Sequence, residues 1–153
     1  MQQIYLVVMD ETKEAQRAMR YASRRALANG GAVQILALVQ PQNFNAFGGV
    51  QATIEQEARD RAEVLASSAA GNLYTESGRM PTISVRVGEG QAVLKDYLAE
   101  HPEVAALVLG AAADGNPGPL VSHFSAHSGS LPCPLVIVPG HLDNEAIDRL
   151  STS

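Results

Sequence analysis

The sequence predicts an α/β protein built on an open, doubly wound sheet of five parallel strands. Apolar runs alternate with helical patterns through the first 140 residues. The runs at 4–9 and 104–109 are apolar at almost every position, which is typical of strands covered on both faces. Strands that alternate with helices pair in parallel through right-handed crossovers. A βαβαβαβαβ order therefore predicts this fold class.

Length and charge narrow the classes of function. A chain of 153 residues is the size of one domain. Its net charge of −5 argues against nucleic acid or an anionic membrane as a partner, because both require a basic surface. Residues 1–9 lack the basic start of a signal peptide, and no apolar run approaches the length of a membrane span. We expect a cytoplasmic protein.

The first half of the chain predicts two strands and two helices. After the strand at 4–9, apolar residues recur at helical spacing from Thr12, and Asn29-Gly30-Gly31 ends this helix. Arginines at 17–25 occupy the other face, which we expect to be solvated. A strand at 33–39 and a loop at 41–49 follow. A long helix then carries an apolar stripe: Ile54, Ala58, Ala62, Leu65, Ala69 and Leu73.

The second half predicts three more strands. In the segment 82–88, apolar residues alternate with Ser84 and Arg86, which indicates an edge strand with one wet face. A helix at 91–100 and the strand at 104–109 follow. A helix at 119–128 begins with Pro119, is capped by Gly129, and leads to a fifth strand at 135–138. The polar tail at 141–153 has a weak helical pattern.

Six segments, in their order and spacing, resemble the universal stress protein family. The resemblance covers nearly the whole chain and implies a family domain at 1–140 with a short tail at 141–153. The segments correspond to the first strand with its aspartate turn, the first helix, and the second to fifth strands: 4–12, 17–22, 35–41, 85–90, 106–110 and 131–138.

The resemblance implies a Rossmann-like fold of the adenine-nucleotide α-hydrolase type, with sheet order 3-2-1-4-5. The order reverses between the first and fourth strands, and ligands bind at such a switch point. Asp10 and Gly110 follow these two strands. The fifth strand would be an apolar edge, through which family members form homodimers; the alternative is that the tail covers it. The residues of this edge are Leu135, Val136, Ile137 and Val138.

The loop at 110–122 decides how much of the family's phosphate site remains. In nucleotide-binding members it reads Gly, two residues, Gly, nine residues, Gly, then Ser or Thr. Here Ala113 replaces the second glycine, and Val121-Ser122 takes the place of the final Gly-Ser/Thr pair. The spacer between these two positions is two residues shorter than the nine of the family motif. Pro117 and Pro119 remove N–H donors. No Lys or Arg lies between residues 95 and 149, so a triphosphate would lack a cation from its own loop.

Two interpretations stay open at this stage. In one, the protein binds ATP or AMP, with Mg²⁺, as a regulatory ligand. In the other, the site is degenerate or adapted, and the protein acts through an unidentified protein partner. Each candidate residue also has a structural explanation, such as a turn or core packing. The candidate site comprises Asp10, Leu38, Val39, Gly88, Gly110, Ala111, Ala113, Gly115, Gly118, Val121 and Ser122.

Catalytic and metal-binding patterns are weak. Cys133 is the one cysteine, with no identifiable base, and we expect a small buried hydrophobe. His123 and His127 have helical spacing but no third ligand beside them, so we expect surface or interface histidines. We therefore predict no catalytic residue and no metal site, and nucleotide hydrolysis ranks lowest among the candidate functions.

Overall fold

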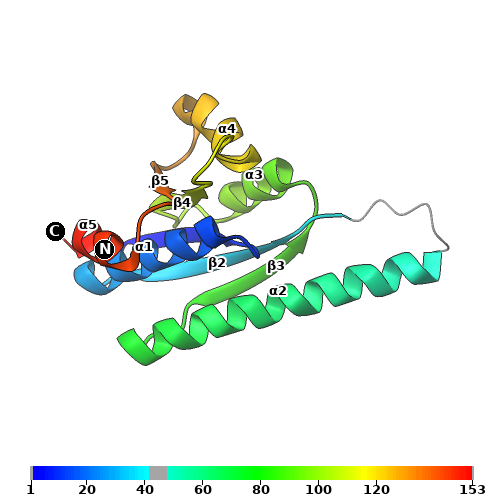
Figure 1. Cartoon of the computed structure of the whole chain (residues 1–153), viewed down its shortest axis with the longest axis horizontal. Helices are drawn as coiled ribbons and strands as arrows, with labels where there is room; N and C mark the ends of the chain where they lie inside the picture. Colours follow the sequence, from blue (N-terminus) through cyan, green and yellow to red (C-terminus); the bar gives the residue numbers. More distant parts are fainter. Residues whose placement is uncertain (1, 42–47, 153) are drawn as a thin grey trace.

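A five-stranded parallel sheet with order β3-β2-β1-β4-β5 lies between two layers of helices (Figure 1). The computed structural model describes residues 2–41 and 48–152. The predicted fold class and strand order are confirmed, and β3 is an edge strand as its alternating pattern indicates. The strands are β1 Ile4–Met9, β2 Ala32–Val39, β3 Thr82–Val87, β4 Ala106–Ala111 and β5 Leu135–Pro139.

Each face of the sheet carries its own apolar core. Val7 and Met9 of β1 pack with helices α1 and α2, whereas Leu6 and Val8 pack with α3 and α4. Because successive side chains of a strand point to opposite faces, this two-sided burial explains the uninterrupted apolar run. The helices are α1 Lys13–Asn29, α2 Gly48–Ser77, α3 Gly90–Glu100, α4 Pro119–Ala126 and α5 Asn144–Thr152.

A short polar turn fixes the start of α1. The carboxylate of Asp10 accepts hydrogen bonds from the backbone N–H of Thr12 at 2.9 Å and from its hydroxyl at 2.5 Å. The Thr12 hydroxyl oxygen in turn accepts from the N–H of Ala15, which caps the helix. At the other end Gly30 takes a left-handed conformation with φ of 72°, as the Asn-Gly-Gly signal predicts.

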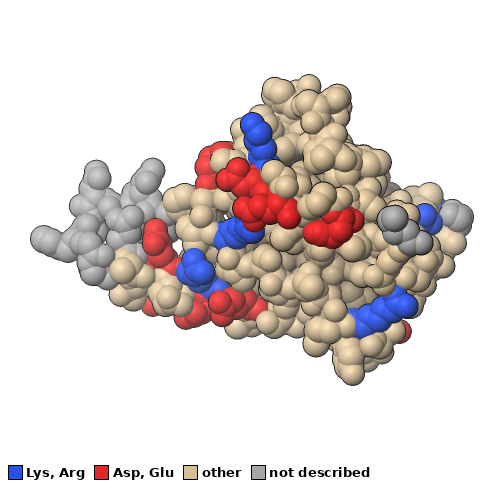
Figure 2. Space-filling view, turned by 180° about the vertical axis from the view of Figure 1, so that it is seen from behind, with Lys and Arg blue, Asp and Glu red and all other residues tan. Residues whose placement is uncertain are grey.

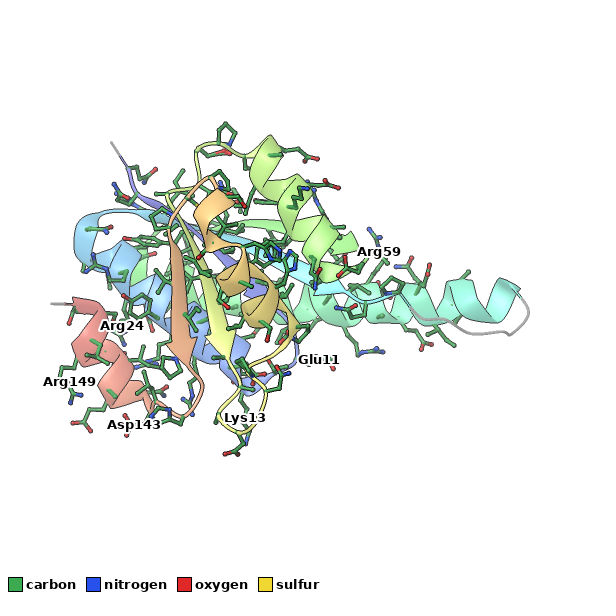
Figure 3. All side chains as sticks on the ribbon, turned by 90° about the horizontal axis from the view of Figure 1, so that it is seen from above. Glu11, Lys13, Arg24, Arg59, Asp143 and Arg149 are labelled. Atoms are coloured by element: carbon green, nitrogen blue, oxygen red, sulfur yellow. The ribbon has the colours of Figure 1, made fainter. Side chains whose placement is uncertain are left out.

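The prediction that the arginine face of α1 is solvated is wrong. The C-terminal helix α5 packs along α1 and buries Ile147 completely (Figures 1 and 3). Asp148 accepts two hydrogen bonds from Arg20, at 2.8 and 2.7 Å, and forms an ion pair with Arg24 at 3.3 Å. The bond from Arg20 lowers the pKa of Asp148. The arginines are therefore the docking surface of the tail.

Several predicted boundaries shift. β4 begins at Ala106, two residues later than predicted, and continues to Ala111, so Gly110 lies inside the sheet opposite Val138. α4 ends at Ala126, where His127 rather than Gly129 is the cap, and the turn Ser128–Ser130 follows. α2 already begins at Gly48, and 42–47 lie outside the described residues. In Figure 1 α2 extends well beyond the sheet.

Acidic side chains gather over the middle of the face seen in Figure 2, with Lys and Arg scattered among them. That face presents no continuous basic surface of the kind that nucleic acid requires. Among the described residues, none of the helices has the length and apolar character needed to cross a bilayer.

Candidate functional site

Two hollows lie at the carboxyl ends of the strands, where the strand order reverses. One, of about 140 Å³, includes Gly110 and the start of α4; the other, of about 200 Å³, reaches α2. They share Asp10, Leu38 and Gln40. The structure thus brings part of the predicted site together at the switch point: Asp10, Leu38, Val39, Gly110, Gly118 and Val121. The other predicted residues do not line either hollow: Gly88, Ala111, Ala113, Gly115 and Ser122.

Asp10 has a structural role in the turn between β1 and α1. One of its carboxylate oxygens accepts both hydrogen bonds from Thr12 and so orients the start of α1. This Asx-type turn explains an aspartate directly after a strand without a ligand. The carboxylate nevertheless lines both hollows and places a negative charge between them.

Gly110 is required by packing. A Cβ at this position would overlap the backbone carbonyl of Glu14 on α1. Gly140 is similar, because a Cβ there would overlap the carbonyl of Ala111. These contacts let α1 and the chain after β5 approach β4 closely. A glycine at 110 is therefore no sign of a phosphate.

The loop 112–118 closes on itself. The side-chain oxygen Oδ1 of Asn116 accepts a hydrogen bond from the N–H of Gly118 at 2.9 Å and from the hydroxyl of Ser122 at 3.4 Å. The N–H of Ala112 donates to the carbonyl of Pro117 at 3.1 Å. Pro119, the first residue of α4, offers no N–H. Oδ1 of Asn116 thus takes two donors beside this helix N-terminus, the N–H of Gly118 and the hydroxyl of Ser122, whereas the first turn of α4 has no side-chain cap.

The charges around the hollows are mainly negative. Asp10, Glu11 and Glu14 line them, and Figure 3 shows Glu11 and Lys13 at this end of the molecule. The cation that lines the second hollow is Arg61 of α2, whose Nε lies 3.4 Å from Glu11. Both side chains are largely exposed, so water screens this ion pair.

Sequence reasoning missed Gln40, Arg61 and Asn116. Gln40 directly follows β2, so its position at a strand end was a usable signal. Arg61 lies about 50 residues from the loop in sequence, and a search confined to the loop cannot find it. Asn116 lies within the loop 110–122, but its closing contacts with Gly118 and Ser122 have no signal in the spacing of the loop.

Neither hollow is lined by His123, His127 or Cys133. The imidazoles of His123 and His127 stack with their centroids 4.4 Å apart. Among the described residues no group of three or more His, Cys, Asp or Glu side chains is placed to hold a metal ion. Cys133 is only partly buried, which differs from the expected full burial. Desolvation raises the pKa of its thiol, which disfavours the nucleophilic thiolate.

Comparison with known proteins settles the family. The model of the universal stress protein family matches residues 1–139. The chain belongs to the universal stress protein family. No match is found among curated protein sequences.

Solved universal stress proteins share the fold at low sequence identity. UspA from Lactobacillus plantarum is 20% identical, with a TM-score of 0.76 over 89% of this chain and 97% of that protein. A universal stress protein from Archaeoglobus fulgidus in complex with dAMP is 15% identical, with a TM-score of 0.53 over 90% and 98%. A family protein from Arabidopsis thaliana with AMP bound is 13% identical, with a TM-score of 0.58 over 90% and 91%. At these identities the likeness establishes the fold.

Proposed function

We propose that this universal stress protein is a regulatory module that acts as a homodimer through contacts with other proteins. Its loop at the switch point does not hold a polyphosphate. The observation that carries this proposal is the position of Asn116, whose side-chain oxygen takes the hydrogen bonds of Gly118 and Ser122. The module comprises residues 1–140, and the tail 141–153 stabilises it through the contact of α5 with α1.

Charge supports the same conclusion. A triphosphate carries several negative charges, and stable binding needs cations or many N–H donors. The loop supplies no cation, because the chain has no Lys or Arg between residues 95 and 149, and Pro117 and Pro119 remove two N–H donors. Asp10 and Glu14 add repulsion at the hollow beside the loop.

The edge strand β5 supports a homodimer. Ile137 at its centre is exposed, and an unprotected apolar edge favours pairing with another strand. α5 lies on α1 and leaves Ile137 exposed, so the tail does not take the place of a partner there. Pairing of two β5 strands would bury this edge.

An adenine mononucleotide is the second candidate. The two hollows share Asp10, Leu38 and Gln40, so a ligand that crosses these residues would occupy both. Arg61 would offer one positive charge, enough for a monophosphate. Two relatives are described with dAMP or AMP bound. The geometry gives no comparable support to ATP with Mg²⁺.

Thermal melting with added nucleotide separates the two candidates. A ligand at 100 times its Kd stabilises the folded state by about 2.7 kcal/mol. We expect no shift with ATP and Mg²⁺ at millimolar concentration for the natural protein. A clear ATP shift in the natural protein would refute the proposal.

The mononucleotide candidate has its own matched variants. If AMP stabilises the protein, Arg61→Gln should remove most of the shift, because Arg61 lines the second hollow. Arg59→Gln is the control: this arginine is also on α2 but does not line the hollow (Figure 3). An AMP shift that is equal in both variants would show that AMP binds elsewhere.

A further inference from the structure

The side of α1 that α5 covers is a basic surface. Its arginines, all half-buried, contact α5 through hydrogen bonds or ion pairs, and Figure 3 shows Arg24 beside α5. We call this surface the arginine face; it comprises Arg17, Arg20, Arg24 and Arg25. Guanidinium groups are suited to pairing with carboxylates. The arginine face is therefore a surface for an acidic ligand within a chain whose net charge is −5.

The contacts of α5 with the arginine face follow a regular pattern. Asn144, Asp148 and Ser151 accept hydrogen bonds from the arginines. Ile147, which lies between them in sequence, is completely buried. These four positions are three and four residues apart where they are neighbours on the helix surface, so they lie on one side of α5. The ligand that fits the arginine face is thus an amphipathic helix with carboxylates beside an aliphatic residue.

α5 itself supplies few carboxylates for this surface. Asp148 pairs with both Arg20 and Arg24, at 2.7 and 3.3 Å. Arg17 and Arg25 donate to neutral oxygens of α5, at 3.0 and 3.2 Å, and have no carboxylate partner among the described residues. A carboxylate would add an ion-pair attraction that a neutral oxygen lacks. A helix with a carboxylate opposite Arg17 would therefore complement the arginine face better than α5 does.

The attachment of α5 to the domain is small. The helix has nine residues and packs chiefly on α1. Ile147 is its one completely buried large apolar residue. The side chains of Arg20 and Asp148 are 31% and 34% exposed, so water screens part of their attraction. Elements with few buried apolar contacts open at low free-energy cost, and so short a helix is not stable once undocked. α5 is therefore an occupant that another helix can displace.

We propose that the arginine face binds an acidic amphipathic helix of a partner protein, which displaces α5. The partner helix places carboxylates opposite Arg17 and Arg20, and an aliphatic side chain where Ile147 lies. α5 acts as an internal competitor that covers the surface until a better-matched helix is present. The inference rests on the function proposed above, because it names a surface for contacts with other proteins. Its test involves neither the loop 112–118 nor β5, so its failure would leave the conclusions on both unchanged.

Fluorescence anisotropy with labelled peptides tests the proposal on the full-length protein. The probe has the sequence of residues 141–153 with Asn144→Asp, which places a second carboxylate opposite Arg17. One matched peptide has the natural sequence, and the other combines Asn144→Asp with Asp148→Asn. We expect saturable binding of the probe, at least about threefold tighter than either matched peptide, because each of these lacks one ion pair. Equal affinity of the natural peptide would overturn the proposal in favour of an exchange of tails between copies of this chain.

Variants of the protein show where the probe binds. Ile147→Ala removes the buried contact of α5 and should tighten probe binding at least about tenfold, since the surface is then covered for less of the time. Leu150→Ala is the control, because this exposed residue of the same helix should leave the affinity unchanged. In the Ile147→Ala background, Arg20→Gln should weaken the probe at least about tenfold, whereas Arg59→Gln on α2 should have little effect.

A second change loosens α5 independently. Asp148→Asn in the protein removes the carboxylate that α5 offers to the arginines, so it should also tighten probe binding. Circular dichroism and thermal melts verify that every variant is folded. The absence of saturable probe binding, no gain in affinity when α5 is loosened, or equal affinities in the Arg20→Gln and Arg59→Gln variants would each overturn the proposal.

Discussion

Replacing Gly110 with alanine tests whether the glycine serves packing. The new Cβ would overlap the carbonyl of Glu14 and approach the Glu14 Cβ at 3.0 Å. Gly110 is paired with Val138 in the sheet, so the strand cannot turn away and α1 must shift. Such overpacking costs about 1–3 kcal/mol. At roughly 2–4 °C per kcal/mol for a chain of this size, Gly110→Ala should lower Tm by about 2–12 °C.

Gly71→Ala provides the matched control. Gly71 lies inside α2, where an added Cβ would meet nothing within 4 Å. Alanine there should stabilise the helix by about 0.5–1 kcal/mol. Urea unfolding followed by circular dichroism, without added ligand, measures both variants. If Gly110→Ala were as stable as the natural protein, the close approach of α1 to β4 would be wrong, and the glycine would need a functional explanation.

Three further variants probe other contacts. Because Arg20 lowers the pKa of Asp148, this carboxylate contributes stability above its unfolded pKa of about 4. The contribution disappears as pH falls through the lower folded pKa. Asp148→Asn should therefore lower the urea midpoint at pH 7 but change it little at pH 2, and an equal shift at both pH values would contradict the ion pair. Thr12→Ala removes the cap of α1 and should cost about 1 kcal/mol in urea unfolding; no loss would mean that the cap is not formed. Ile137→Lys should convert a dimer to a monomer in light scattering, and a dimer that persists would exclude β5 as its interface.

The fold was predictable because its signals are local and repeated. The two-sided burial of β1 appears as an uninterrupted apolar run, and the alternation in β3 indicated its edge position, although burial along β3 itself does not alternate. Gly30 ends α1 where the Asn-Gly-Gly signal placed the end. Periodicity and turn chemistry suffice for such elements, because each depends on neighbours in sequence.

The docking of α5 was not predictable from α1 alone. When the partners of its arginines are unknown, a row of arginines on a helix predicts a solvent-exposed face. The partner Asp148 lies 128 positions from Arg20. The tail is polar, and the one completely buried large apolar residue of its helix is Ile147. Charge pairing between distant segments leaves no periodic signal in either.

The position of the switch point was predictable, but the residues that line its two hollows were only partly predictable. The switch point follows from strand order, and Asp10 and Gly110 both lie there. The reasons for these residues differ from the expectation, since Asp10 forms a turn and Gly110 accommodates α1. The hydrogen bonds by which the Asn116 side chain closes the loop 112–118 depend on the conformation of the loop backbone. Residue spacing alone does not define that conformation.

Nucleotide released from the purified protein tests the central claim most directly. The claim is that the loop 112–118, which Asn116 closes through hydrogen bonds from Gly118 and Ser122, holds no polyphosphate. The protein is denatured, and the supernatant is analysed by ion-exchange chromatography with mass spectrometry. We predict no ATP, whether or not a mononucleotide is present. Release of ATP near one equivalent per chain would contradict the account.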